Sequence, residues 1–116
     1  MRALLAGVLT GLLACATATA SAHGYDGVYR FPGTQGCTFL GIDNGVIQIR
    51  RGVLSGTEND CRMTNPVEVR DMDATLYDLQ CQGEGMGWQE RAMIIRSGNG
   101  VVIARRGYAQ EFERCG

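Results

Sequence analysis

The chain contains no lysine, only one histidine and two prolines, and its formal net charge is −1. Without lysine there is no side chain for a Schiff base or a lysine phosphate clamp. The single histidine, His23, lies near the start of the chain, so no Ser-His-Asp or Cys-His pair can be built inside a fold. The near-neutral charge argues against nucleic acid or a membrane surface as the partner. The composition therefore predicts a protein that is not an enzyme and has no cofactor.

Long apolar runs are also scarce, and only the start of the chain contains one. An arginine follows the first methionine, residues 3–14 are apolar apart from one threonine, and small residues fill positions 15–22. This layout is typical of a secretory signal, and its apolar core is shorter than the ~18 residues that a membrane helix needs. We therefore expect a signal peptide over residues 1–22, one small domain over residues 23–116 and no transmembrane segment in the mature chain.

The signal offers more than one processing site. Cleavage after Ala22 or after Ala20 follows an Ala-x-Ala pattern. In the alternative, Leu-Leu-Ala-Cys at residues 12–15 is similar to a bacterial lipobox, with Cys15 as the acylated residue. The basic side chains are all arginine, which is typical of a GC-rich bacterial genome. We expect a periplasmic or secreted bacterial protein, with a lipoprotein anchored through Cys15 as the alternative.

Four cysteines follow the signal, namely Cys37, Cys61, Cys81 and Cys115. An even number of cysteines in a small exported domain predicts two disulfides. Zinc ribbons need close pairs such as Cys-x-x-Cys, which are missing, so no metal site is expected. A turn near Met72 would bring Cys61 opposite Cys81 and leave Cys37 for Cys115. We prefer this nested connectivity slightly to the sequential one, 37–61 with 81–115.

An Asn-Gly pair at residues 44–45 separates two alternating apolar runs, which is the signature of a type I′ hairpin. A turn centred there pairs Ile42 with Ile47 and Leu40 with Ile49. The pattern therefore predicts that these four side chains share one core face.

A second turn, at residues 98–99, separates two runs rich in β-branched residues. It pairs Ile94 with Ile103 and Ile95 with Val102. Because both faces of this hairpin are apolar, we expect it to lie inside the sheet rather than at an edge.

A third hairpin joins residues 74–81 to residues 88–95 through a loop at residues 82–87. In one register, three residues of the first strand share the inner face with three of the second: Tyr77 with Ala92, Leu79 with Glu90, and Cys81 with Trp88. An acid at the inner position of Glu90 is unexpected, and a bulge or a register shift would move it outward.

Shorter strands are expected at residues 27–31, 60–64, 67–70 and 108–114. Turn signals recur roughly every 8–12 residues, and no helical period follows the signal. The sequence therefore predicts an all-β domain of seven or eight short antiparallel strands, mostly a meander, forming a small barrel or a curled sheet with two disulfides.

Glu90 is the acid expected closest to an apolar wall, beside Trp88. A buried acid of this kind could donate a proton in catalysis. The more frequent arrangement is an ion pair with an arginine, here Arg91 or Arg105. We therefore expect no catalytic residue.

The loop at residues 82–87 is the expected contact site, because loops on a rigid scaffold often carry binding. It lies directly before the only tryptophan, and methionine and tryptophan are common interface anchors. We expect Glu84, Met86 and Arg91 to rim a contact patch beside Trp88. In the alternative, Trp88 packs in the core and the loop only turns the chain.

A set of spaced residues has the look of a family motif: Glu58-x-x-Cys61, then Asn65-Pro66-Val67-x-Val69-Arg70-x-Met72, then Cys81-x-Gly83-Glu84-Gly85-x-x-Trp88-x-x-Arg91, and finally Cys115. Over residues 25–115 it resembles small secreted proteins of alphaproteobacteria, and this resemblance implies no particular activity. The size, signal and β-rich pattern are also similar to periplasmic lysozyme inhibitors of the membrane-bound C-type class, in architecture only.

Together these features favour an exported, disulfide-stapled binding module whose partner is a protein or another envelope component. A secreted hydrolase that the module inhibits is one candidate partner. The alternative function is that of a lipid-anchored structural protein of the envelope.

Overall fold

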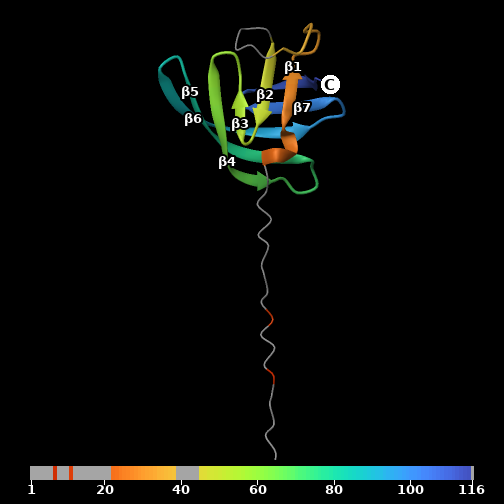
Figure 1. Cartoon of the computed structure of the whole chain (residues 1–116), viewed down its shortest axis with the longest axis vertical. Coiled ribbons are helices and arrows are strands. Elements are labelled where there is room, and N and C mark those ends of the chain that lie inside the picture. Colours follow the sequence, from red (N-terminus) through yellow and green to blue (C-terminus); the bar gives the residue numbers. More distant parts are fainter. Residues whose placement is uncertain (1–6, 8–10, 12–21, 39–44, 116) are drawn as a thin grey trace, which may run out of the picture.

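The chain forms consecutive antiparallel strands, each paired with the next, and the last pairs with the first to close a barrel (Figure 1). The computed structural model describes residues 7, 11, 22–38 and 45–115. A short 3-10 helix, η1 (Ala22–Tyr25), is followed by β1 (Gly27–Arg30), β2 (Val46–Arg50), β3 (Val53–Ser55), β4 (Asn59–Glu68), β5 (Ala74–Gly83), β6 (Met86–Arg96), β7 (Gly100–Arg105) and β8 (Tyr108–Arg114). The expected all-β barrel of seven or eight strands is thus confirmed.

The signal peptide expected over residues 1–22, with Cys15 and the cleavage site after Ala20, lies outside the described residues except for positions 7, 11 and 22. Among the described residues, no helix is both long enough and apolar enough to span a bilayer.

The core fills the inside of the barrel, because alternate side chains of each strand point inward. Its buried members come from most of the strands and include Tyr29, Ile49, Leu54, Tyr77, Leu79, Ala92, Ile94, Val101 and Ile103. Each buried valine, leucine or isoleucine side chain among them stabilises the fold by about 1.5–3 kcal/mol relative to leaving it exposed.

Two of the expected hairpins have the predicted register. In β6–β7, Ile94 pairs with Ile103 and Ile95 with Val102. In β5–β6, the ladder is continuous from Ala74 to Gly83, and Leu79 is opposite Glu90 as expected. The suggested bulge or shift is therefore wrong, and Glu90 stays on the inner face.

The prediction of a loop at residues 82–87 is also wrong, because β5 and β6 extend almost to the tip of their hairpin. Gly83 pairs with Met86, so the turn consists of Glu84 and Gly85 alone. Both turn residues have positive φ, 51° and 76°. This is the conformation of a type I′ turn, which suits the twist of two paired strands and lets the ladder continue to its end.

The hairpin predicted around residues 44–45 has different partners. Leu40 and Ile42 lie outside the described residues. Ile47 and Ile49 pair with Tyr29 and Gly27 of β1, across a long connection. A local turn pattern cannot show that β2 pairs with a strand that lies further back in the chain.

The strand β3 was missing from the sequence prediction. A two-residue turn, Arg51-Gly52, joins it to β2, and both residues have positive φ, 50° and 78°. Arginine is rare in this conformation, and Arg51-Gly52 is not one of the Asn-Gly or Asp-Gly pairs that mark such a turn. The turn therefore cannot be recognised from its residues.

The strands expected at 60–64 and 67–70 form one strand, β4, with an irregularity between Thr64 and Val67. Asn65 has a φ of 51° and Pro66 follows it. Proline has no N–H to donate to a ladder, which confines it to bulges and edges, so the chain bulges here instead of ending the strand.

The two disulfides have the nested connectivity, Cys61–Cys81 and Cys37–Cys115. Cys61 and Cys81 lie directly opposite each other on β4 and β5. The second bridge joins the connection after β1 to the residue that follows β8. It therefore staples the seam of the barrel, where Tyr29 of β1 pairs with Arg114 of β8 and Arg30 pairs with Glu113.

The two ends of the barrel differ. The helix η1 covers one end, at the bottom of Figure 1. There the Tyr25 hydroxyl lies 2.8 Å from Thr75 Oγ1 and donates to the carbonyl of Ile94 at 3.2 Å. Its ring packs edge-on against Tyr77, and the Tyr29 hydroxyl donates to the carbonyl of Tyr25. The β3–β4, β5–β6 and β7–β8 connections gather at the opposite end, which we call the open end.

Candidate functional site

A cavity of about 280 Å³ lies at the open end of the barrel. We call it the mouth cavity. It lies between the inner faces of β7 and β8, the first residue of β4 and the residue after β1, and it is lined by Phe31, Asn59, Ile103, Arg105, Tyr108, Gln110 and Phe112. Aromatic walls with a few polar groups are typical of binding sites.

An ion pair between Glu90 and Arg105 lies at the inner edge of this cavity. The β5–β6 register turns Glu90 inward, and Arg105 comes from the last position of β7. Both side chains are mostly buried, with 31% and 25% of their surface exposed. The sequence prediction of an arginine partner is confirmed for Arg105, so each charge in this half-buried site has its counterpart.

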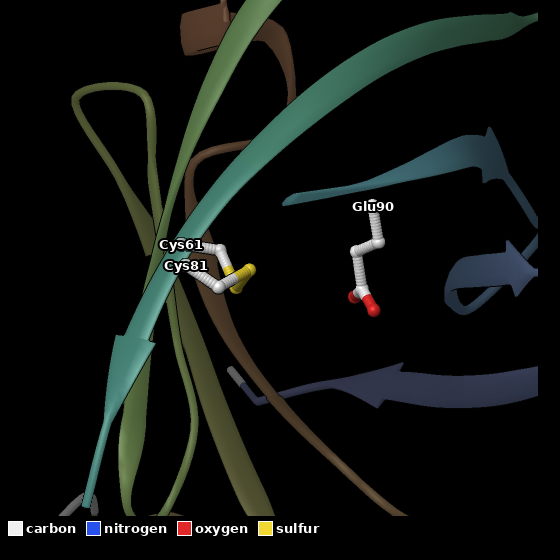
Figure 2. A group of neighbouring side chains, drawn as sticks. All are labelled: Cys61, Cys81 and Glu90. Atoms are coloured by element: carbon white, nitrogen blue, oxygen red, sulfur yellow. A yellow bond between two sulfur atoms is a disulfide. The ribbon is translucent and has the colours of Figure 1, made fainter. Parts of the chain in front are cut away.

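Figure 2 shows Glu90 near the Cys61–Cys81 disulfide, inside the barrel. One potential ligand atom from each of the three residues lies within 4.8 Å of the others. The cysteine form that binds metal ions is the thiolate, and these two sulfurs are bonded to each other. The carboxylate already accepts from Arg105. In the oxidised protein this cluster therefore offers a structural staple and an ion pair and not a set of metal ligands.

Large apolar side chains are exposed at the open end. Met86 is 68% exposed, Tyr108 61%, Phe31 38% and Trp88 36%. Two further exposed apolar side chains, Val67 and Met72, lie at the other end, near the β4–β5 connection.

The structure places the predicted contact residues on two faces. Glu84, Met86 and Trp88 lie together at the β5–β6 tip, and Trp88 is opposite Cys81 at the rim of the barrel. Its exposure excludes the alternative in which it packs in the core. Arg91 lies on the outer face, because its neighbour Glu90 points inward.

On that outer face, Arg91 Nε lies 3.1 Å from Asp78 Oδ1. Hydrogen bonds from Asn65 and from Arg91 hold the pKa of the Asp78 carboxyl below its ordinary value. The structure thus brings Arg91 into a surface ion pair and separates it from the rim that contains Trp88.

A broader hollow of about 830 Å³ lies between the β3–β4 connection and the β5–β6 tip. Its lining includes Glu58, Asp60 and Met86, and Asn59 lines both this hollow and the mouth cavity. The hairpin tip and the mouth therefore form one continuous surface.

Sequence reasoning missed the residues that β8 contributes to this surface. Tyr108, Gln110 and Phe112 alternate along β8, so they share the inner face. The period of two was the available signal. This alternation could not show that Tyr108 and Gln110 lie beyond the packed core.

Comparison of the chain with models of protein families, with curated proteins and with solved structures finds no match. The geometry of the open end is therefore the basis for an inference about function.

Proposed function

We propose that this protein is an exported binding module that contacts a folded protein partner through the open end of its barrel. The observation that carries the proposal is the group of exposed side chains Phe31, Met86, Trp88 and Tyr108 at that end. Aromatic residues and methionine are enriched in protein interfaces, and exposed apolar patches mark interaction sites.

Rigidity supports this proposal. The Cys61–Cys81 bridge lies directly beneath the β5–β6 tip, and Cys61 and Cys81 are both buried. A two-residue turn leaves the tip little conformational freedom. A contact surface that is already ordered loses less entropy when it binds. Two disulfides in a small domain also fit an oxidising compartment outside the cytoplasm.

The shape of the tip suggests the class of partner. A hairpin that ends in two residues and exposes Met86 is convex, and it fits a concave partner surface. Substrate clefts are the principal concave surfaces of enzymes. We propose that the partner is a secreted hydrolase and that the module inhibits it by covering its cleft.

Site-specific photocrosslinking tests the contact surface. Met86 or Tyr108 is replaced by p-benzoylphenylalanine in one pair of variants, and Val67 or Met72 in a matched pair at the opposite end. Upon irradiation in periplasmic extract, the first pair should crosslink to one shared protein and the second should not. Equal crosslinking from both pairs would mean that the open end is not the contact surface.

Inhibition is tested with purified hydrolases, namely a lysozyme, a serine protease and a lipase. We expect dose-dependent loss of activity with one of them, and recovery of that activity when the inhibitor carries both Trp88→Ala and Tyr108→Ala. Inhibition that survives the double substitution would contradict this use of the open end.

A further inference from the structure

The strand β6 is longer than the neighbour on its β7 side. Along its β5 side it is paired from Met86 to Ile95. Along its β7 side the pairing begins only at Met93, because β7 ends at Arg105 and the chain turns back. Within the described part of the chain, no strand pairs with the stretch 86–92 on that side. We call this stretch the free edge.

The hydrogen-bonding groups on the free edge can be assigned from the ladder. The N–H of Arg96 donates to the carbonyl of Asp73, which precedes β5, at 2.8 Å. In an antiparallel pair, the N–H and C=O of one residue point to the same side, and successive residues alternate. Even-numbered residues of β6 therefore bond to β5, and Gly87, Gln89 and Arg91 direct their N–H and C=O groups to the free edge.

We propose that an extended segment of the protein partner binds here as an added strand, antiparallel to β6. This inference rests on the proposed function and names how the partner engages the same surface. Main-chain hydrogen bonds to Gly87, Gln89 and Arg91 would provide affinity, and alternate side chains of the segment would provide specificity. The inward ones would meet Trp88 and Met86, which lie on the inner face of β6.

Charge defines the start of this segment. Extending the β6–β7 register past Met93–Ala104 places Arg106, in the β7–β8 turn, at the level of Arg91. Arg106 is exposed, and no described residue forms an ion pair with it. The side chain of Arg91 is 74% exposed, and Asp78 is its ion-pair partner among the residues that the structure describes. The segment therefore carries an acidic residue at its N-terminal end, between these two arginines.

A second copy of the chain fits this edge less well. When two β6 strands pair antiparallel with matching faces around Trp88 or Gln89, Arg91 is opposite Gly85 or Gly87. Neither register places an acid next to Arg91. Charge complementarity thus favours a different polypeptide.

The test uses a synthetic peptide of nine residues that begins with two glutamates and continues with alternating isoleucine and threonine. Trp88 is the only tryptophan, so its fluorescence reports binding next to the free edge. We expect saturable binding to the oxidised protein. Hydrogen exchange of the amides of Gly87, Gln89 and Arg91 should slow in the complex, because these amides become bonded.

A matched pair of variants separates the backbone from the side chain. Gln89→Pro removes one free-edge N–H without breaking the β5–β6 ladder, and it should weaken binding by about tenfold. Gln89→Ala keeps the N–H and should bind within about twofold of the wild type. If Gln89→Pro does not fold, a peptide N-methylated at alternate residues replaces it and should not bind to the wild-type protein.

A charge exchange tests the acidic end. A peptide with two lysines in place of the glutamates should bind the wild type more weakly, and Arg106→Glu should reverse that order. Absence of peptide binding, or equal binding by Gln89→Pro and Gln89→Ala, would overturn strand addition. A concentration-dependent dimer that Gln89→Pro abolishes would show that a second copy of the chain fills the edge, and it would overturn the assignment to a different polypeptide. Crosslinks from Met86 and Tyr108 that persist in Gln89→Pro would leave the contact surface intact and reject only the added strand.

Discussion

The two ends of this barrel are built from the same alternating strands but differ in what covers them. At the end closed by η1, the aromatic side chains are Tyr25, Tyr29 and Tyr77, each at most 4% exposed. At the open end, Tyr108 and Trp88 occupy inner-face positions and remain in contact with solvent. An inward-pointing aromatic residue is therefore not always a core residue, because position along the barrel decides whether neighbouring layers cover it.

The charges differ in the same way. Near η1, the Arg96 guanidinium packs over the Tyr25 ring at 4.9 Å and donates to the Gly24 carbonyl. It therefore covers from outside the end that η1 closes, which we call the plugged end. At the open end, Arg105 and Glu90 point into the barrel and pair with each other. An internal ion pair stabilises less than apolar packing of similar volume, so we regard the plugged end as the source of stability and the open end as the place for function.

The largest expected difference comes from one tyrosine at each end. Tyr25→Ala should lower the free energy of unfolding by about 3–5 kcal/mol, because a buried ring and its hydrogen bonds are lost. Tyr108→Ala should change it by less than about 0.5 kcal/mol, since this ring is exposed. Urea denaturation of the oxidised proteins measures both. Similar losses at the two positions would mean that the ends do not differ in stability.

Alkaline pH should act on the plugged end first. Burial raises the pKa of Tyr77 to about 12, and it also raises the pKa of Tyr25 and Tyr29. The folded state therefore holds these protons more tightly than the unfolded chain, in which tyrosine ionises near pH 10. The stabilisation is complete below about pH 10 and is lost as the pH rises through 12, by about 2.7 kcal/mol for Tyr77.

Unfolding free energies measured between pH 8 and pH 12 in about half-unit steps check this expectation. Tyr77→Phe serves as the matched variant, because it keeps the ring and removes the ionising group. Its stability should decline less steeply above pH 10. A decline of the same slope would show that other groups cause the alkaline loss.

The smallest expected effect is at the open end. A double-mutant cycle with Glu90→Gln and Arg105→Met should give a coupling of about 1 kcal/mol, since both groups are mostly buried. The same cycle for Asp78→Asn and Arg91→Met, on the exposed outer face, should give a coupling closer to zero. Chemical denaturation of each set of four proteins provides the values. A larger coupling for the outer pair would indicate that the mouth is as well solvated as the surface.

Much of the fold could be predicted from local residues. The alternation of Tyr77, Leu79 and Cys81 against Ala92, Glu90 and Trp88 defined a register that the structure keeps. The turn near Met72 favoured the nested disulfides only slightly over the sequential pairing, and the structure has the nested pair because β4 and β5 place Cys61 opposite Cys81. Even the unexpected inner acid, Glu90, was correctly assigned an arginine partner. The contact site was predicted less well, because Arg91 alternates to the outer face and the expected loop is a tight turn.

Local patterns in the chain identify most of the strands, show which residues of a strand share a face, and indicate that four cysteines staple a small β domain. These properties depend on steric preferences and on periodicity over a few residues. The folded barrel alone shows that β2 pairs with β1, that Tyr25 closes one end, and that Tyr108, Phe31 and Asn59 meet at the other. Those contacts join residues far apart in the chain, and their free energy depends on barrel closure, which no local pattern specifies.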